Sequence, residues 1–163
     1  MNKIIEIKDL EKTFTNGEVT KVLCGVNFSI EKGEFVSIMG PSGSGKSTLL
    51  HILGFLDKQT SGQYLFNNID NQTLSDDEIA HIRNKEIGFV FQSFNLLAKT
   101  NVLDNVKLPL LYSNVKEDKW DDLAKEAIEL VSLTNRTYYD VSKLSGGEKQ
   151  RVAIARALIL NPQ

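Results

Sequence analysis

Nine consecutive residues carry the clearest chemical signal in the chain, a loop suited to binding phosphate. They are Gly40, Pro41, Ser42, Gly43, Ser44, Gly45, Lys46, Ser47 and Thr48, and they fill the pattern G-x-x-x-x-G-K-[ST]. Glycine lets the backbone wrap a phosphate where a Cβ would clash. In such a loop Lys46 reaches the outer phosphates and the Ser47 hydroxyl ligates Mg²⁺. The alternative is a glycine- and serine-rich turn before an ordinary helix.

The sequence on either side of this loop favours the phosphate site over the plain turn. Residues 34–39 are typical of a buried strand, and residues 48–53 are typical of a helix. A strand, a glycine turn and a helix in this order aim backbone N–H groups and the positive end of the helix at one spot. We therefore expect the loop to join a buried strand to the N-terminus of a helix.

A second pair of glycines follows a serine later in the chain. Ser145 and Glu148 have the spacing of a capping box, and Gly146 and Gly147 lie between them. Two glycines directly after a helix cap leave the first N–H groups open to an approaching anion. From these residues alone, a simple helix start and an anion site are equally supported.

The chain up to Gln92 has the pattern of a sheet. Strands are predicted over residues 4–10, 19–30, 62–66 and 87–91. Asn16 and Gly17 predict a turn between the first two, and Gly25 is a candidate bulge. The first forty residues thus predict antiparallel strands that lead into a parallel core.

Helices dominate the sequence after Gln92. They are predicted over residues 101–112 and 116–133 and after Ser145, and one more is predicted to start before this region, near Asp76. One apolar face recurs at helical spacing in the second of these, formed by Trp120, Leu123, Ala124, Ala127 and Val131. Such a stripe indicates core packing rather than a cofactor site.

Composition restricts the possible functions. The 163 residues carry a net charge of −2, so no basic field attracts nucleic acid or an anionic membrane. The single cysteine, Cys24, fits a reducing compartment, and we expect it to be a buried small hydrophobe. Because no segment has the pattern of a membrane span or signal peptide, we expect a cytoplasmic chain linked to any membrane through a partner protein.

Three motifs, taken in order, resemble a known family. Residues 40–48, Gln92 and residues 144–150 together resemble the ATP-binding subunit of an ATP-binding-cassette (ABC) transporter. A narrower likeness, to the branch of lipoprotein-release, macrolide-export and antimicrobial-peptide-export ATPases, is carried by residues 37–50, 54–57 and 87–96.

The resemblance implies a fold and a division of the chain. The expected class is α/β, with a P-loop NTPase (RecA-like) core, an N-terminal antiparallel β subdomain and a helical subdomain. Residues 1–94 would form the β subdomain and the core, residues 95–142 the helical subdomain, and residues 143–163 the signature-motif helix. All 163 residues would then belong to one ABC transporter ATP-binding domain.

The resemblance also implies roles for residues outside the phosphate loop. Phe14 takes the place of the aromatic side chain that stacks on adenine, where tyrosine is more usual. Gln92 takes the place of the glutamine that touches Mg²⁺ and the attacking water. Residues 145–148 take the place of the segment that contacts the γ-phosphate of an ATP molecule held by a second copy.

The implied activity is ATP hydrolysis, with Lys46 and Gln92 as the catalytic residues and with ATP and Mg²⁺ as cofactors. Two copies would dimerise head to tail around two ATP molecules. Residues 92–142 would contact a transmembrane permease, which would place the subunit on the inner face of the membrane. Hydrolysis would drive export or membrane extraction of a substrate such as a lipoprotein, peptide or macrolide. No nucleic acid is implied.

The 163 residues depart from the family pattern in one respect. The family next places an apolar strand that ends in Asp, then a Glu that polarises the attacking water, and later a histidine. No residue of this sequence has that context, and His51 and His81 do not replace the histidine. We therefore expect a cassette truncated before this Walker B motif, without the C-terminal part of its core. Alone, it is expected to be marginally stable and inactive as an ATPase.

Other function classes fit less well. The missing Asp-Glu pair favours a nucleotide-binding module without turnover as the main alternative. A DNA-associated ATPase of the chromosome-maintenance type shares both phosphate motifs, but it separates them with coiled coils or zinc modules. This sequence has neither heptads nor cysteine pairs between them. A small-molecule kinase would leave residues 144–150 unexplained.

Overall fold

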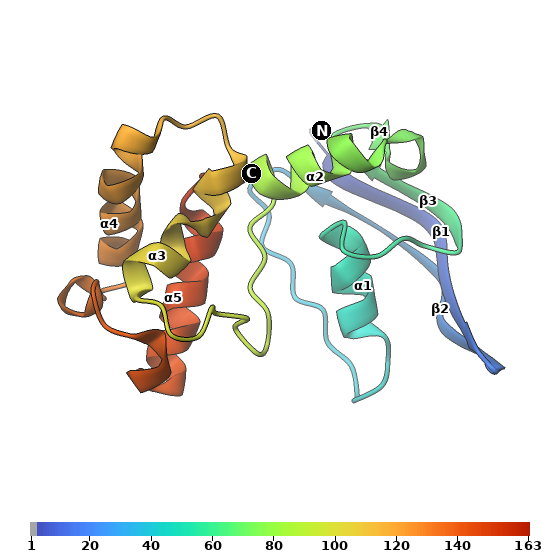
Figure 1. Ribbon diagram of the computed structural model, residues 1–163. Helices are drawn as coiled ribbons and strands as arrows, with labels where there is room; N and C mark the ends of the chain where they lie inside the picture. Colours follow the sequence, from blue (N-terminus) through green and yellow to red (C-terminus); the bar gives the residue numbers. More distant parts are fainter. Residues whose placement is uncertain (1–2) are drawn as a thin grey trace. The chain divides into compact units, whose positions relative to one another are not determined.

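The computed structural model describes residues 3–163, the side chain of Asn16 excepted, and the chain divides into two compact units (Figure 1). The first unit ends at Ile79 and contains a sheet and one helix packed on it. The second begins at Ala80 and is helical. The predicted three-part division, with boundaries at residues 94 and 142, stays a prediction.

Four antiparallel strands form the sheet of the first unit, in the order β2-β1-β3-β4. Their bounds are β1 (Lys3–Asn16), β2 (Glu18–Glu31), β3 (Ser61–Phe66) and β4 (Ile69–Asp70). Gly17 turns β1 into β2 with a φ of +85°, and Asn67 and Asn68 turn β3 into β4 with φ values of +49° and +65°. The prediction of N-terminal antiparallel strands is confirmed.

Gly25 interrupts the pairing of β2 with β1, as its sequence context predicts. Leu10 pairs with Val26 and Lys12 pairs with Leu23, so β2 advances by three residues between these pairs while β1 advances by two. Gly25 lies within that interval and has a φ of +70°. A β-bulge of this kind adds one residue to one strand and increases the local twist.

Helix α1 (Lys46–Leu53) packs on the sheet and closes the apolar core of the first unit (Figure 1). The Tyr64 hydroxyl donates a hydrogen bond of 2.8 Å to the Leu53 carbonyl oxygen, and burial raises the pKa of this hydroxyl well above its usual range. The core comprises Ile7, Leu10, Leu23, Leu49, Ile52, Phe55, Tyr64 and Phe66.

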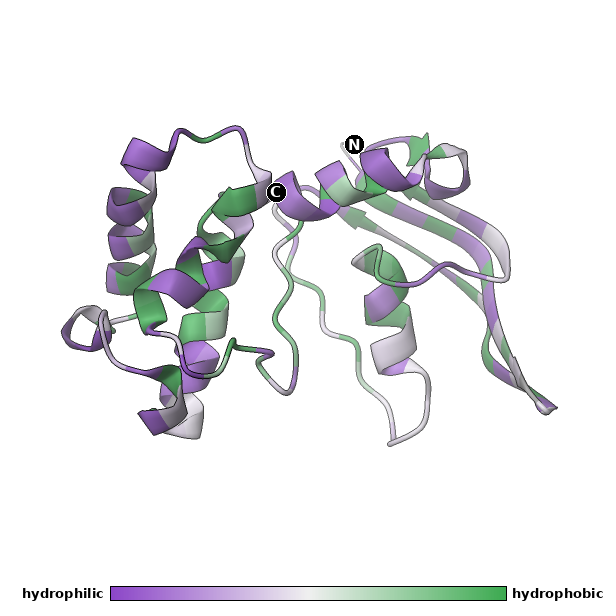
Figure 2. Cartoon of the chain, viewed as in Figure 1, coloured by the Kyte–Doolittle hydropathy of each residue, from purple (hydrophilic) through white to green (hydrophobic). Residues whose placement is uncertain are grey.

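Two predicted strands are absent from the sheet ladders of the described residues. Residues 34–39 leave β2 as an irregular segment, with Phe35 95% and Met39 87% exposed, and Figure 2 shows this largely hydrophobic stretch between β2 and α1. Residues 87–91 are also irregular. The prediction of two buried strands is therefore wrong for this structure. A strand needs a neighbouring strand for its hydrogen bonds, and an apolar run of residues does not show whether such a neighbour is present.

Cys24 is exposed, contrary to the prediction that it is buried. It lies on β2, which is one of the two edge strands of the sheet. Successive side chains of a strand point to opposite faces, and the preceding residue, Leu23, is the one that enters the core.

Four helices shape the rest of the chain. α2 (Asp76–Lys85) crosses the division between the units, and the second unit contains α3 (Val102–Lys107), α4 (Trp120–Leu130) and α5 (Gly146–Leu158). The predicted helix over residues 101–112 changes at Leu108 to a 3-10 turn (Leu108–Tyr112), because Pro109 cannot donate the next helical hydrogen bond.

The second unit has an apolar core of its own, which we call the helical core. Its members come from α3, α4, α5 and the turns between them, with Val102, Val106, Ile128 and Val152 fully buried. Trp120 packs against it, as predicted, and its indole Nε1 donates a 2.9 Å hydrogen bond to the Val115 carbonyl oxygen. Figure 2 shows hydrophilic residues along the outer side of α4. Among the described residues, no helix has the length and apolar character needed to cross a membrane.

Candidate functional site

The phosphate loop lies where the sequence predicts it, immediately before α1. Gly45 is the residue before the helix and has a φ of +85°, and the Leu49 N–H donates to its carbonyl oxygen at 2.9 Å. A Cβ at Gly45 would lie 2.9 Å from the Val22 carbonyl oxygen and 2.8 Å from the Leu23 Cδ2. Glycine is therefore required here both by the backbone conformation and by the close approach of the loop to β2.

Lys46 folds back over the loop that precedes it. Its Nζ donates to the carbonyl oxygens of Gly40 at 2.9 Å and Pro41 at 2.7 Å, and it lies 3.5 Å from the Ser44 hydroxyl. The ammonium group is therefore held at the loop, next to the N-terminus of α1. An anion bound by the first N–H groups of the helix would meet this positive charge.

The N-terminus of α1 is left without the usual protein groups that satisfy a helix end. It has no side-chain cap hydrogen bond and no acidic residue in its first turn. Ser47 is exposed in that turn, and Thr48 is half-buried. Uncapped N–H groups, an ammonium group and an exposed hydroxyl form a donor set that suits a triphosphate and its Mg²⁺ ion.

Phe14 lies on β1, which pairs with the stretch of β2 that the loop approaches. Its side chain is 38% exposed. Two residues before it, Lys12 pairs with Leu23, the residue against which Gly45 packs. A strand rises about 3.3 Å per residue, so Phe14 lies within the length of a nucleotide of the phosphate loop. Phe14, which pairs with Thr20, and Gly45, which packs against Val22 and Leu23, thus adjoin the same stretch of β2, although the sequence separates them by more than twenty residues.

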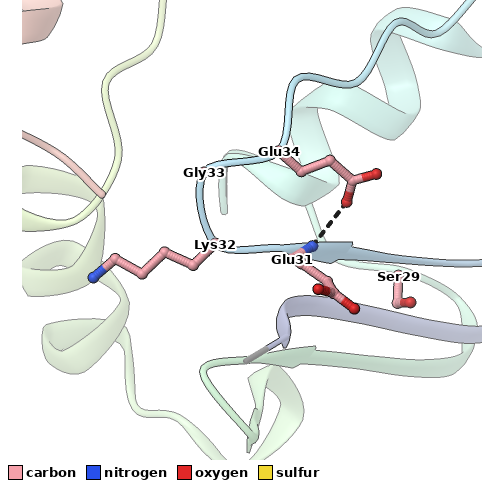
Figure 3. A pocket seen from close by; sticks show the side chains of 5 residues that line it. All are labelled: Ser29, Glu31, Lys32, Gly33 and Glu34. Carbon is pink, nitrogen blue, oxygen red and sulfur yellow. Dashed lines mark hydrogen bonds between the residues drawn. The ribbon is translucent and has the colours of Figure 1, made fainter. Parts of the chain in front are cut away.

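A pocket at the end of β2 has a different character (Figure 3). It is lined by Ser29, Glu31, Lys32, Gly33 and Glu34, and the Glu34 carboxylate accepts a 2.9 Å hydrogen bond from the Glu31 N–H. Figure 3 shows the Lys32 side chain directed away from the two glutamates. Two carboxylates repel a phosphate group, so this pocket does not compete with the loop as a nucleotide site.

Gln92 is exposed in a turn of the second unit. The segment that follows it is fixed by Arg156 of α5, whose guanidinium donates to the carbonyl oxygens of Phe94 and Asn95, each at 2.7 Å. Burial lowers the pKa of the Arg156 guanidinium. Phe94 and Asn95 have φ values of +63° and +45°, so these two hydrogen bonds hold a backbone conformation that is rare for such residues. The predicted contact of Gln92 with Mg²⁺ stays a prediction.

Ser145 and Glu148 form the predicted capping box at the N-terminus of α5. The Glu148 carboxylate accepts from the Ser145 N–H at 2.9 Å and from its hydroxyl at 2.8 Å, and the Glu148 N–H donates to that hydroxyl oxygen at 3.3 Å. Gly146 and Gly147 form the first turn between them, and a Cβ at Gly146 would meet open space. The helix cap is therefore confirmed, and contact with a nucleotide stays a prediction.

Arg136 completes this cap from a neighbouring turn. Its Nε donates to the Glu148 carboxylate at 3.1 Å, and its guanidinium lies 4.4 Å from the centre of the Tyr139 ring. The backbone N–H and hydroxyl of Ser145, together with Arg136, lower the pKa of the Glu148 carboxyl to about 2. The contacts of Arg136, Arg156 and Lys12 were not predicted from the sequence, because a contact between distant residues produces no local spacing pattern.

Comparison with known proteins identifies the family. The sequence signature of the ABC transporter family matches residues 23–163. The chain belongs to the ABC transporter family. The dimeric ABC transporter cassette MJ0796 of Methanocaldococcus jannaschii has a TM-score of 0.89 and 45% identity over 97% of this chain and 70% of its own. This likeness confirms the α/β P-loop NTPase fold, with an antiparallel N-terminal sheet and helices.

Two curated relatives are ATP-binding proteins of export or release systems. The macrolide export protein MacB of Bdellovibrio bacteriovorus is 48% identical over 98% of this chain and 24% of its own length. The lipoprotein-releasing system protein LolD of Colwellia psychrerythraea is 45% identical over 99% of this chain and 63% of its own length. This ABC protein is therefore an ATP-binding subunit that uses ATP and Mg²⁺. ATP hydrolysis is general in its family, and MJ0796 has been solved in a post-hydrolysis state bound to ADP and Pi.

Proposed function

We propose that this protein is the ATP-binding subunit of an export-type ABC transporter. It would couple ATP binding and hydrolysis to export or membrane extraction of a substrate such as a lipoprotein, peptide or macrolide. The observation that carries the proposal is the phosphate loop, with its uncapped helix N-terminus and the ammonium group of Lys46. The similarity to MacB and LolD supports the choice of substrate class.

The nucleotide would be held along the face of the first unit that carries the loop. Phe14 would stack on adenine, residues 40–48 would bind the phosphates, and Ser47 with Gln92 would hold Mg²⁺. Residues 145–148 would contact the γ-phosphate of an ATP molecule bound by a second copy. The dimeric state of the MJ0796 cassette supports this head-to-tail arrangement.

Residues 92–142 would contact the permease and bring the subunit to the inner face of the membrane. Leu111 and Tyr112 support this part of the proposal, because both are exposed apolar residues in the turn after α3. Burial of a large exposed apolar side chain against a partner protein is favourable. The net charge of −2 gives no basic field for nucleic acid.

Titration calorimetry with Mg²⁺-ATP tests the proposal on wild type, Lys46→Ala and the control Lys58→Ala. Charged hydrogen bonds are worth about 1.5–3 kcal/mol, so loss of the Lys46 ammonium should raise the Kd by roughly 10- to 100-fold. Lys58 has an exposed side chain that is paired with Asp76 at 3.5 Å, and its removal should leave the Kd unchanged. Equal affinities of wild type and Lys46→Ala would contradict the proposal.

A second candidate is nucleotide binding without turnover by the 163-residue chain. The sequence favours it because no apolar run in these residues is followed by an Asp-Glu pair. Phosphate release by the purified chain should then stay at the background rate of Lys46→Ala. Turnover above that rate would reject this candidate and leave the hydrolytic subunit.

A further inference from the structure

Lys12 occupies an unusual position for a lysine. Lys12 is only 9% exposed, and its Nζ donates hydrogen bonds to the Asp57 carboxylate and to the Lys58 carbonyl oxygen, each at 2.6 Å. Lysine is seldom this buried unless it is paired. Here the pairing fixes the ammonium group between β1 and the segment that follows α1.

The fixed ammonium group lies over the ring of Phe14, with its Nζ 4.8 Å from the ring centre. This is within the distance of a cation–π interaction. Because Lys12 covers one face of the ring, a planar group can stack only on the other face. Phe14 remains 38% exposed, so the side chain is partly accessible while its position is held.

We propose that Lys12 is a positioning residue for the nucleotide base, which holds the Phe14 ring from one face and presents the other face to adenine. The inference rests on the proposed function, in which Phe14 stacks on ATP. It extends that function by assigning a role to a residue that does not itself touch the ligand.

Two physical effects support this role. A ring whose rotamer is fixed before binding loses less conformational entropy when the base arrives. The ammonium group also draws the negative charge of the ring toward the covered face. Two stacked aromatic faces repel through their quadrupoles, so this shift favours an electron-rich base on the open face. Phenylalanine has no hydroxyl with which to anchor itself, which leaves Lys12 as the polar group that orients it.

A direct charge effect on the phosphates is a weaker explanation. Asp57 lies 2.6 Å from the ammonium group, so the pair is close to neutral at a distance. A purely structural tie between β1 and residues 57–58 is the remaining alternative, and the experiment has to separate it from action through the ring.

A double-mutant cycle on the full chain makes that separation. The Kd for Mg²⁺-ATP is measured by calorimetry for wild type, Lys12→Met, Phe14→Ala and the double variant. A cation–π contact of ordinary strength predicts that Lys12→Met raises the Kd by roughly 3- to 10-fold when Phe14 is present. In the Phe14→Ala background the same change should alter the Kd by less than about twofold, because interacting residues are not additive.

Asp57→Asn is the matched control, since it removes the ion pair but keeps the ammonium group in place through the amide oxygen of the new side chain and the unchanged Lys58 carbonyl oxygen. It should keep the wild-type Kd within about twofold. Thermal melting checks that each variant is folded, and Lys12→Gln, which keeps a hydrogen-bond donor, replaces Lys12→Met if the latter does not fold.

Equal effects of Lys12→Met in both backgrounds, no effect in either, or an equal loss in Asp57→Asn would each overturn the proposal. Failure of the underlying function has a different signature. In that case wild type and Lys46→Ala bind Mg²⁺-ATP equally poorly, whatever residue stands at position 12.

Discussion

α1 follows a loop of glycine and serine, and α5 begins with two glycines after a serine, yet the two helix N-termini are completed in opposite ways. α1 begins after Gly45, with no side-chain cap and no acidic residue in its first turn. α5 begins after Ser145, with a full capping box and Glu148 in its first turn. The protein therefore satisfies the end of α5 by itself, whereas it leaves the N–H groups of α1 open to an anion that would lie next to the Lys46 ammonium group.

This difference has a consequence for the second site. The Ser145 hydroxyl donates to the Glu148 carboxylate and accepts from the Glu148 N–H. Under the proposed function this hydroxyl turns from Glu148 to the γ-phosphate held by a second copy. On this proposal the α1 end would bind an anion without giving up a cap, and the α5 end would exchange one hydrogen-bond partner for another.

The largest expected effect is a loss of stability of the second unit, which follows when a side chain of the helical core that packs with α5 is shortened. Ile128→Ala empties a fully buried position of the helical core, and such truncations cost about 2–5 kcal/mol. The second unit should unfold at lower urea, as followed by the single tryptophan, Trp120. Leu130→Ala, at an exposed position of the same helix, is the control. Equal stability of the two variants would show that this core does not hold the unit.

The next effect acts on the α1 end alone. Gly45→Ala combines a φ of +85° with a Cβ only 2.9 Å from the Val22 carbonyl oxygen, and should cost roughly 2–4 kcal/mol. Gly43→Ala is matched, because its φ is +80° and its Cβ would meet open space, so only about 1–2 kcal/mol is expected. Urea unfolding checks the difference. Equal losses would mean that the contact with β2 does not shape the loop.

A smaller and local effect should follow loss of Arg156 from α5. Arg156→Met removes both hydrogen bonds to the Phe94 and Asn95 carbonyl oxygens. A charged hydrogen bond is worth about 1.5–3 kcal/mol, so amides of residues 92–97 should exchange at least about tenfold faster. Arg151→Met, exposed on the same helix, should not change them. Unchanged exchange in Arg156→Met would show that α5 does not fix this segment.

The smallest effect concerns acid stability at the α5 cap. Because Ser145 and Arg136 lower the pKa of Glu148 to about 2 from the ordinary 4.5, its charged form stabilises the folded chain. That contribution is complete above about pH 4.5 and is lost as the pH falls toward 2. Glu148→Gln should therefore show a smaller fall in Tm between pH 6 and pH 3 than wild type or the exposed control Glu126→Gln. An unchanged fall would contradict the assigned cap.

Local sequence patterns predicted the features that neighbouring residues decide. The hairpin turn at Gly17, the bulge at Gly25, the loop before α1 and the cap of α5 all depend on a few consecutive residues. The prediction of a strand over residues 34–39 was wrong because strand pairing depends on a partner strand that is distant in the sequence. The prediction that Cys24 is buried was wrong because Leu23, the residue before it on β2, takes the core face.

The missed side chains share the same cause. Lys12 meets Asp57 across 45 residues, and Arg156 meets Asn95 across 61 residues. Neither contact produces a periodic or short-range pattern in the sequence, so both are visible only in the folded structure. The motif residues that the sequence did identify, Lys46 and Ser145, act through their immediate neighbours.

Hydrogen exchange with and without Mg²⁺-ATP tests most directly the claim that the N-terminus of α1 is built for a phosphate. At concentrations where the chain is monomeric, we expect amides of residues 43–48 to become protected while those of residues 145–149 do not change. Lys46→Ala should abolish the protection. Protection that is absent from residues 43–48, or equal in Lys46→Ala, would show that this helix end does not bind the phosphates.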